Sequence, residues 1–93
     1  MRDVFAAHAG GVMGDLNIVG RMVRRARVAP TPRVTQQALA VRLQMLGWDI
    51  DRFGVSKIER GARRVTDREV LLLAEALGIS VAVLLPGVEG SRE

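Results

Sequence analysis

The side chains of this sequence that can do chemistry are mostly basic, and they are clustered. Residues 18–64 carry eleven Arg or Lys side chains against three carboxylates, a balance of +8, whereas the rest of the chain carries three Arg against seven acids. Charge distributed so unevenly forms one basic surface, which is the electrostatic footprint expected of a phosphate-binding protein. The other interpretation of the same pattern is a basic face that only meets solvent.

Side chains suited to catalysis or metal binding are scarce. The chain has no Cys and no Tyr, and its single His, His8, cannot build a histidine cluster. The glycine-rich stretch at residues 10–14 follows no strand, so it is not a phosphate loop. Asp49 and Asp51 suggest a metal, but no third ligand accompanies them, and a helix-capping role is preferred. We therefore expect no enzyme activity, no metal and no cofactor.

The elements that must position the basic surface are helices. Hydrophobic residues make up 48% of the 93-residue chain and aromatic residues 3%, which favours an aliphatic core between packed helices. Charged residues break every apolar run before it reaches the length of a membrane span, and no signal-peptide pattern opens the chain. We expect a soluble, cytoplasmic protein with a flexible arm at residues 1–17, one folded domain at residues 18–87 and a tail at residues 88–93.

Apolar spacing and capping signals predict an all-α fold of five short helices. Each expected helix has a start or stop signal of its own, because caps, prolines and glycines act locally on the backbone. The predicted helices are residues 18–29 before Pro30 and Pro32, residues 35–46 from the cap Thr35, a third after the cap Asp51, a fourth from the Thr66 and Glu69 capping box to Gly78, and a short fifth from Ser80 to Pro86.

Four motifs in order carry a resemblance to a known family. They are VRRAR at residues 23–27, TQQALA at 35–40, VSKIERG at 55–61 and LAEALGIS at 73–80. The segment from residue 23 to residue 86 resembles the Cro and phage-repressor family of helix-turn-helix proteins. The resemblance implies a five-helix, lambda-repressor-like DNA-binding domain.

The sequence departs from that family pattern in two places. The stretch from Thr35 to Glu59 is roughly five residues longer than is usual, with the excess around residues 44–49, so either the second helix gains a turn or the connecting turn is enlarged. Gly54 stands where the family more often has Ser or Thr, and glycine is a poor helix former.

The resemblance also implies roles for individual residues. The third helix would be the recognition helix, whose N-terminal residues face base edges in the major groove, while residues around it contact phosphates. The expected base contacts are Arg52, Phe53, Ser56 and Lys57, and the expected backbone contacts are Gln36, Arg33, Arg42, Arg63 and Arg64.

Other residues are expected to have structural roles. By the same resemblance, Arg27 and Glu59 form a partly buried ion pair between the first and third helices. Trp48 is interpreted as a hydrophobic cover over the turn between the second and third helices. A homodimer is expected, with its interface at apolar residues near the C-terminus that the fifth helix does not need, namely Val81, Val83 and Leu85.

The function predicted from these features is a sequence-specific, double-stranded DNA-binding transcriptional regulator, acting as a repressor. The alternative is a protein-interaction module of the antitoxin or phage-adaptor type on the same scaffold. Charge favours DNA, because a purely protein-binding version needs no balance of +8 across three helices, whereas DNA affinity rises with each phosphate neutralised. A protein partner in addition to DNA stays open.

Overall fold

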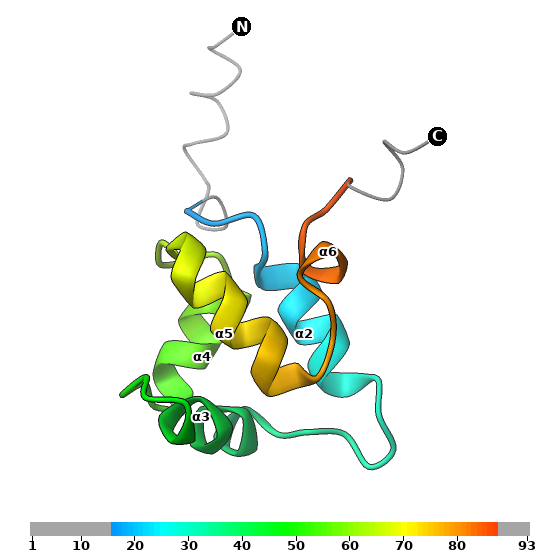
Figure 1. Ribbon diagram of the computed structural model, residues 1–93, viewed down its shortest axis with the longest axis vertical. Helices are drawn as coiled ribbons and strands as arrows, with labels where there is room; N and C mark the ends of the chain where they lie inside the picture. Colours follow the sequence, from blue (N-terminus) through cyan, green and yellow to red (C-terminus); the bar gives the residue numbers. More distant parts are fainter. Residues whose placement is uncertain (1–15, 88–93) are drawn as a thin grey trace, which may run out of the picture.

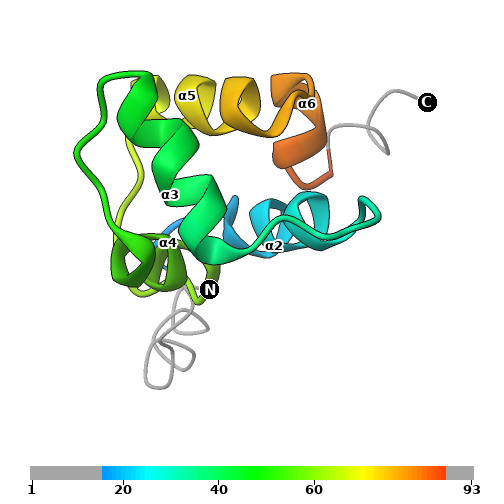
Figure 2. The same cartoon turned by 90° about the horizontal axis from the view of Figure 1, so that it is seen from below.

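A computed structural model describes residues 16–87, and within that range every regular element is a helix. The elements in chain order are α2 (Gly20–Val28), α3 (Gln36–Met45), α4 (Arg52–Glu59), α5 (Asp67–Leu77) and α6 (Val81–Leu84). Figure 1 shows them gathered around one centre, and Figure 2 shows α3 running between a layer formed by α5 and α6 and a layer formed by α2 and α4. Within residues 16–87, the predicted all-α fold with five helices is confirmed.

Helix α2 is fixed at its start by an asparagine that precedes it. The Asn17 side-chain oxygen accepts hydrogen bonds from the amides of Val19 and Gly20, at 3.0 and 2.7 Å, which satisfies donors that have no partner within the helix. The same side chain donates to the carbonyls of Ile58 and Arg63, so it also ties α2 to the end of α4. Asn17 therefore takes part in holding the beginning of α2 against the end of α4.

The polar caps that begin three of the helices lie where the sequence predicts them. Thr35 accepts from the amide of Ala38, Asp51 accepts from the amide of Gly54, and Thr66 forms a reciprocal capping box with Glu69. Ser80 is different, because it occupies the cap position of α6 but its side chain makes no capping hydrogen bond. Its backbone carbonyl instead accepts from the amide of Val83.

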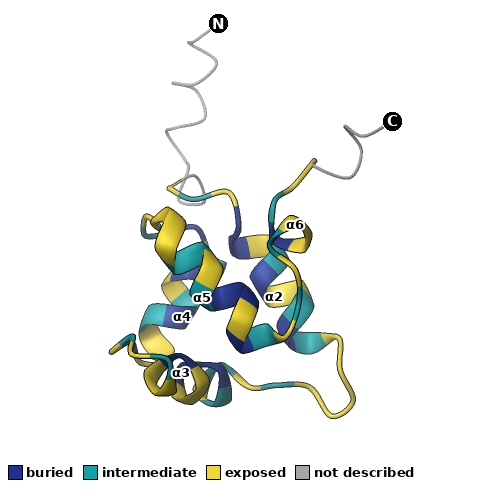
Figure 3. Cartoon of the chain, viewed as in Figure 1, coloured by how far each residue is buried: buried dark blue, intermediate teal, exposed yellow. Residues whose placement is uncertain are grey.

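The core is aliphatic and lies between all five helices. Val23, Leu39, Leu43, Ile58 and Leu73 have no exposed surface. Figure 3 shows the buried surfaces of the helices turned toward one another and the exposed surfaces turned outward. The half-buried Trp48 packs against this core, in keeping with its expected role as a cover.

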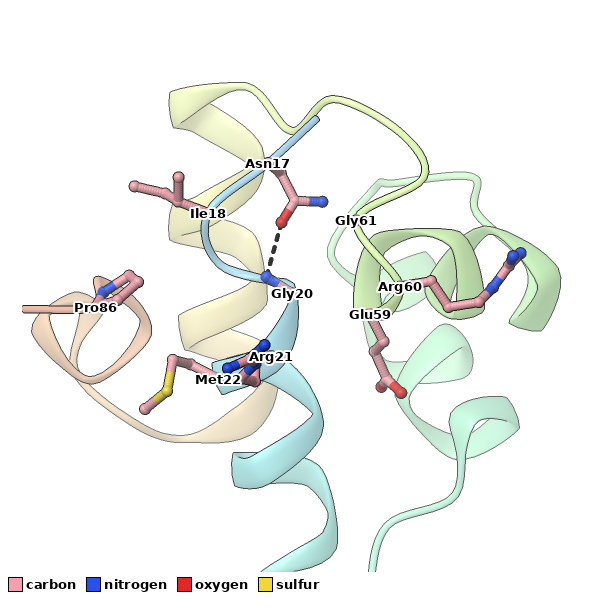
Figure 4. A pocket seen from close by; sticks show the side chains of 9 residues that line it. All are labelled: Asn17, Ile18, Gly20, Arg21, Met22, Glu59, Arg60, Gly61 and Pro86. Carbon is pink, nitrogen blue, oxygen red and sulfur yellow. Dashed lines mark hydrogen bonds between the residues drawn. The ribbon is translucent and has the colours of Figure 1, made fainter. Parts of the chain in front are cut away.

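Glycine at position 20 allows α2 and α4 to approach each other closely. A Cβ atom at this position would overlap the carbonyl oxygen of Ile58 in the last turn of α4. The start of α2, the end of α4 and Pro86 surround a small cavity, and Figure 4 shows Asn17 within it, bonded to the amide of Gly20. The C-terminal end of α4 is therefore held tightly against α2.

Candidate nucleic-acid interface

Helix α4 presents one polar and basic face to the outside of the domain. Val55 and Ile58 are fully buried on its inner side. Because successive residues of an α-helix are about 100° apart, residues at positions 52, 53, 56, 57 and 60 share the opposite side. That outward face consists of Arg52, Phe53, Ser56, Lys57 and Arg60, of which Ser56 is half-buried and the others are exposed.

The four expected base-contacting residues all lie on this face, but they do not point in one direction. Arg52 and Lys57, five residues apart, diverge by about 140° around the helix axis. The guanidinium of Arg52 lies over the ring of Phe53, 4.9 Å from its centroid. Phe53 and Ser56 therefore lie nearer the middle of the face, with Arg52 on one edge and Lys57 toward the other.

The beginning of α3 lies beside the Arg52 edge and forms a site suited to an anion. An open groove there is lined by Arg27, Arg33, Thr35, Gln36, Gln37 and Arg52. The groove lies at the N-terminus of α3, where the first backbone N–H groups have no partner within the helix. The positive end of the helix dipole there favours a negative group. Among the described residues, no acidic side chain lines it. The groove therefore combines helix amides with the guanidinium of Arg33, for which no bond to another described residue is seen.

An ion pair between α2 and α4 lies next to this groove, because its arginine is one of the lining residues. The Nε atom of Arg27 donates to Oε2 of Glu59 at 2.6 Å, and its Nη2 donates to Oε1 at 2.9 Å. The side chains are only 8% and 4% exposed. Gln36 donates from Nε2 to the same carboxylate at 3.0 Å, so the pair also fixes the first turn of α3. The expected Arg27–Glu59 pair is confirmed.

A comparison of the chain with protein-family models shows which family has this arrangement of helices. A model described as helix-turn-helix matches residues 33–84, which is more than half of the chain and includes α3 and α4. The chain belongs to the Cro and phage-repressor type of helix-turn-helix family. A search of curated proteins finds no match, and neither does a search of solved structures. Proteins of this helix-turn-helix family are DNA-binding transcription regulators.

The four arginines expected to contact the DNA backbone differ in whether their side chains already bond other parts of the protein. Arg33 and Arg64 are exposed, and no side-chain hydrogen bond or ion pair is seen for either within residues 16–87. Arg42 donates from Nη1 to the carbonyl of Ala76 at 3.1 Å, which turns it toward α5. Arg63 lies over the Trp48 ring and beside Glu69. Among these four arginines, Arg33 and Arg64 have the guanidinium groups best placed to meet a phosphate.

Arg60 belongs to the helix-turn-helix surface, although it is not among the residues that the sequence predicts to contact DNA. It is exposed at the end of α4, and its Nε lies 3.4 Å from the hydroxyl oxygen of Ser56. Its spacing of four residues from Ser56 places it on the same face, and this signal was available in the sequence.

The segment between the cap Thr35 and the beginning of α4 consists of helix α3 and the connection that follows it. Helix α3 has 10 residues and ends at Met45, and residues 46–51 lead to α4. Gly47 has a φ of 97°, a backbone conformation that favours glycine, where the chain leaves α3. The absence of a side chain at residue 54 also has a local reason, because a Cβ there would lie 2.6 Å from Cγ1 of Ile50.

Two further findings concern the described residues alone. No helix within residues 16–87 is long and apolar enough to cross a membrane. In the same range, no group of three His, Cys, Asp or Glu side chains is arranged to hold a metal ion.

Proposed function

We propose that this protein is a sequence-specific regulator that binds double-stranded DNA with α4 in the major groove and acts as a repressor. The observation that carries the proposal is the outward face of α4, with its exposed cations, beside the beginning of α3, whose backbone N–H groups suit an anion. A helix presented in this way fits the major groove, and a helix N-terminus beside it fits a phosphate of the flanking backbone. A small domain bound over a promoter excludes polymerase, which is the basis of the proposed repression.

Base readout is assigned to the outward face of α4, and general affinity to the arginines around it. Lys57 and Arg52 can donate to guanine O6 and N7, and the Phe53 ring can contact a thymine methyl group. Arg33 and Arg64 supply phosphate contacts that carry no sequence information. Gln36 keeps one side-chain hydrogen bond to Glu59 and has a second N–H with which to reach a phosphate.

A salt titration of binding to random duplex DNA tests the proposal. The logarithm of the affinity should fall linearly with the logarithm of the salt concentration, because each neutralised phosphate releases condensed counterions, with a slope of about −0.9 per phosphate. Replacing Arg64 by Ala should reduce the slope by about one unit. No binding to duplex DNA at low salt would refute the proposal and favour the protein-interaction module instead.

Arg52 provides a second test, directed at sequence discrimination. A preferred site is first selected by the wild-type protein from a random duplex pool. Arg52→Ala should then lose about 1 to 3 kcal/mol on this site and little on a scrambled duplex. Arg33→Ala is the matched control, and it should weaken both duplexes equally. Equal weakening of both duplexes by Arg52→Ala would contradict the proposed orientation of α4.

We further propose a homodimer on DNA, since one short recognition helix covers few base pairs and this motif usually reads two half-sites. The surface that supports it is apolar and lies on α5 and α6. Val81 and Leu85 line a groove there together with Val70 and Leu71, and Leu71 is 58% exposed.

The dimer proposal is tested by the stoichiometry of the complex. Leu71 on α5 lines this groove and Val41 on α3 does not, and both side chains are exposed, at 58% and 42%, so Val41 serves as the control. In analytical ultracentrifugation with the selected site, Leu71→Glu should leave one protein per duplex, whereas Val41→Glu should retain two. One wild-type protein per duplex at saturation would refute the dimer.

A further inference from the structure

The connection between α3 and α4 is an ordered part of the domain. The side chain of Gln44 donates to the carbonyl of Ile50 at 2.8 Å, which closes the connection onto the last turn of α3. The amide of Trp48 donates to the carbonyl of Leu43 at 3.0 Å. Because both bonds join the connection to α3, the path of the chain into α4 follows from the position of α3.

The first turn of α4 rests directly on this connection. Ile50 is 7% exposed, and its side chain occupies the place where a Cβ atom of residue 54 would lie. Asp51 accepts from the amide of Gly54 at 2.9 Å and fixes the same turn. The far end of α4 is held independently by Asn17 and Gly20, so the connection controls the end of α4 that carries Arg52 and Phe53.

One arginine joins the connection to α5. The Cζ atom of Arg63 lies 5.5 Å from the centroid of the Trp48 ring, a distance at which a cation is attracted to the ring face. Its Nη2 atom lies 3.4 Å from both carboxylate oxygens of Glu69. The backbone carbonyl of Arg63 accepts from Asn17, so the residue is anchored at both ends.

The charges around Arg63 indicate that it is engaged within the protein. Its side chain is 32% exposed, and the carboxylate beside it offsets its charge. The open groove next to it is lined by Trp48, Asp49, Asp51 and Lys57, among others, so acidic groups lie near it as well. A phosphate approaching Arg63 would meet these carboxylates, whereas Arg64 is exposed and no ion pair is seen for it within residues 16–87.

We infer that Trp48, Arg63 and Glu69 form a clasp that sets the direction of α4, and that Arg63 is a positioning residue for base readout. This inference rests on the proposed DNA-binding function and assigns Arg63 a role other than phosphate contact. Bidentate base contacts depend on helix direction, so a released connection loses discrimination between sites before it loses general affinity.

Glu69→Gln is the decisive variant. Glutamine at this position can keep the capping box with Thr66, since Glu and Gln both serve there, but it removes the charge that faces Arg63. Simple electrostatics predicts that losing an acid strengthens binding to every duplex. The clasp predicts instead that the preference for the selected site over a scrambled duplex falls by about threefold to tenfold. The fall is no larger because the contacts of Arg63 with Trp48 and Glu69 are weak, and they can favour one direction of α4 by no more than their own interaction free energy.

Arg63→Gln and the neighbouring Arg64→Gln complete the experiment. Affinities for the selected and scrambled duplexes are measured for each variant over a series of salt concentrations, with thermal unfolding as a check that each variant is folded. Arg63→Gln should lower the preference as Glu69→Gln does and leave the salt slope unchanged. Arg64→Gln should leave the preference unchanged and reduce the slope by about one unit.

The outcomes separate this inference from the proposed function. If wild-type protein binds no duplex, the proposed function fails and the clasp fails with it. If wild-type protein binds and discriminates, but Arg63→Gln reduces the slope by about one unit at unchanged preference, Arg63 is a phosphate contact and the clasp is refuted. An unchanged preference in Glu69→Gln refutes it as well.

Discussion

Replacing Glu59 by Gln tests the ion pair on which the base of the interface rests. In the wild-type protein Arg27 makes two hydrogen bonds to Glu59 and a third, from Nη1, to the carbonyl of Val34 at 2.9 Å. The variant removes the one carboxylate within residues 16–87 that pairs with the guanidinium of Arg27, whose side chain is 8% exposed. Removing one partner of a buried pair costs about 3 to 5 kcal/mol, and the amide oxygen of Gln can still accept one bond, so we expect the lower part of this range.

Urea unfolding measures this loss of stability. With an m-value of about 1.5 kcal/mol/M, a loss of about 3 kcal/mol lowers the unfolding midpoint by roughly 2 M. The matched control is Glu75→Gln, because Glu75 is exposed on α5 and its replacement should change the free energy of unfolding by less than about 0.5 kcal/mol.

A double variant separates the buried charge from other effects of the change. Replacing Arg27 by Met and Glu59 by Leu together removes both charges, and apolar pairs of similar volume often restore the stability lost on breaking a buried ion pair. The double variant should therefore be more stable than Glu59→Gln alone. The reasoning about the buried charge is wrong if Glu59→Gln costs less than about 1 kcal/mol. It is also wrong if the double variant loses as much stability as Arg27→Met and Glu59→Leu lose when their separate costs are added.

Three further tests, each by urea unfolding, concern the packing and the caps. Gly20→Ala should cost about 1 to 3 kcal/mol or more, because the added Cβ meets backbone that cannot turn aside, and an unchanged midpoint would contradict the close helix contact. Thr66→Ala should cost about 0.5 to 2 kcal/mol, whereas Ser80→Ala should cost less than about 0.5, since only Thr66 bonds its helix; equal losses would contradict this assignment. Gly54→Ala should destabilise the protein although alanine favours helices, and its cost should be smaller in an Ile50→Ala background, which removes Cγ1, if Ile50 is the obstacle.

Local signals in the sequence account for most of the helix boundaries. Thr35, Asp51 and Thr66 act on amides three residues away, so their effect can be predicted without knowledge of the tertiary fold. The αL conformation of Gly78 at the end of α5 is of the same kind, with a φ of 71°. Ser80 is an exception to this local rule, because it stands at the cap position of α6 without a capping hydrogen bond. A helix of four residues offers little for a side-chain cap to stabilise.

The pairing of Arg27 with Glu59 was predicted from the family resemblance alone. The two residues lie 32 positions apart, and no periodicity connects them. The hydrogen bond from Gln36 to Glu59 was not predicted, because the resemblance implies that Gln36 contacts the DNA backbone.

Tertiary structure decided which basic residues remain available to a ligand. Arg33, Arg42, Arg63 and Arg64 are equivalent in sequence, where each is simply a cation near the helix-turn-helix. In the folded chain Arg42 reaches a carbonyl 34 residues away and Arg63 lies between groups from two other segments, while Arg33 and Arg64 stay free within the described residues. A long guanidinium side chain takes whichever acceptor the packing of helices brings near it, and that packing is set by the burial of apolar faces rather than by the charges themselves.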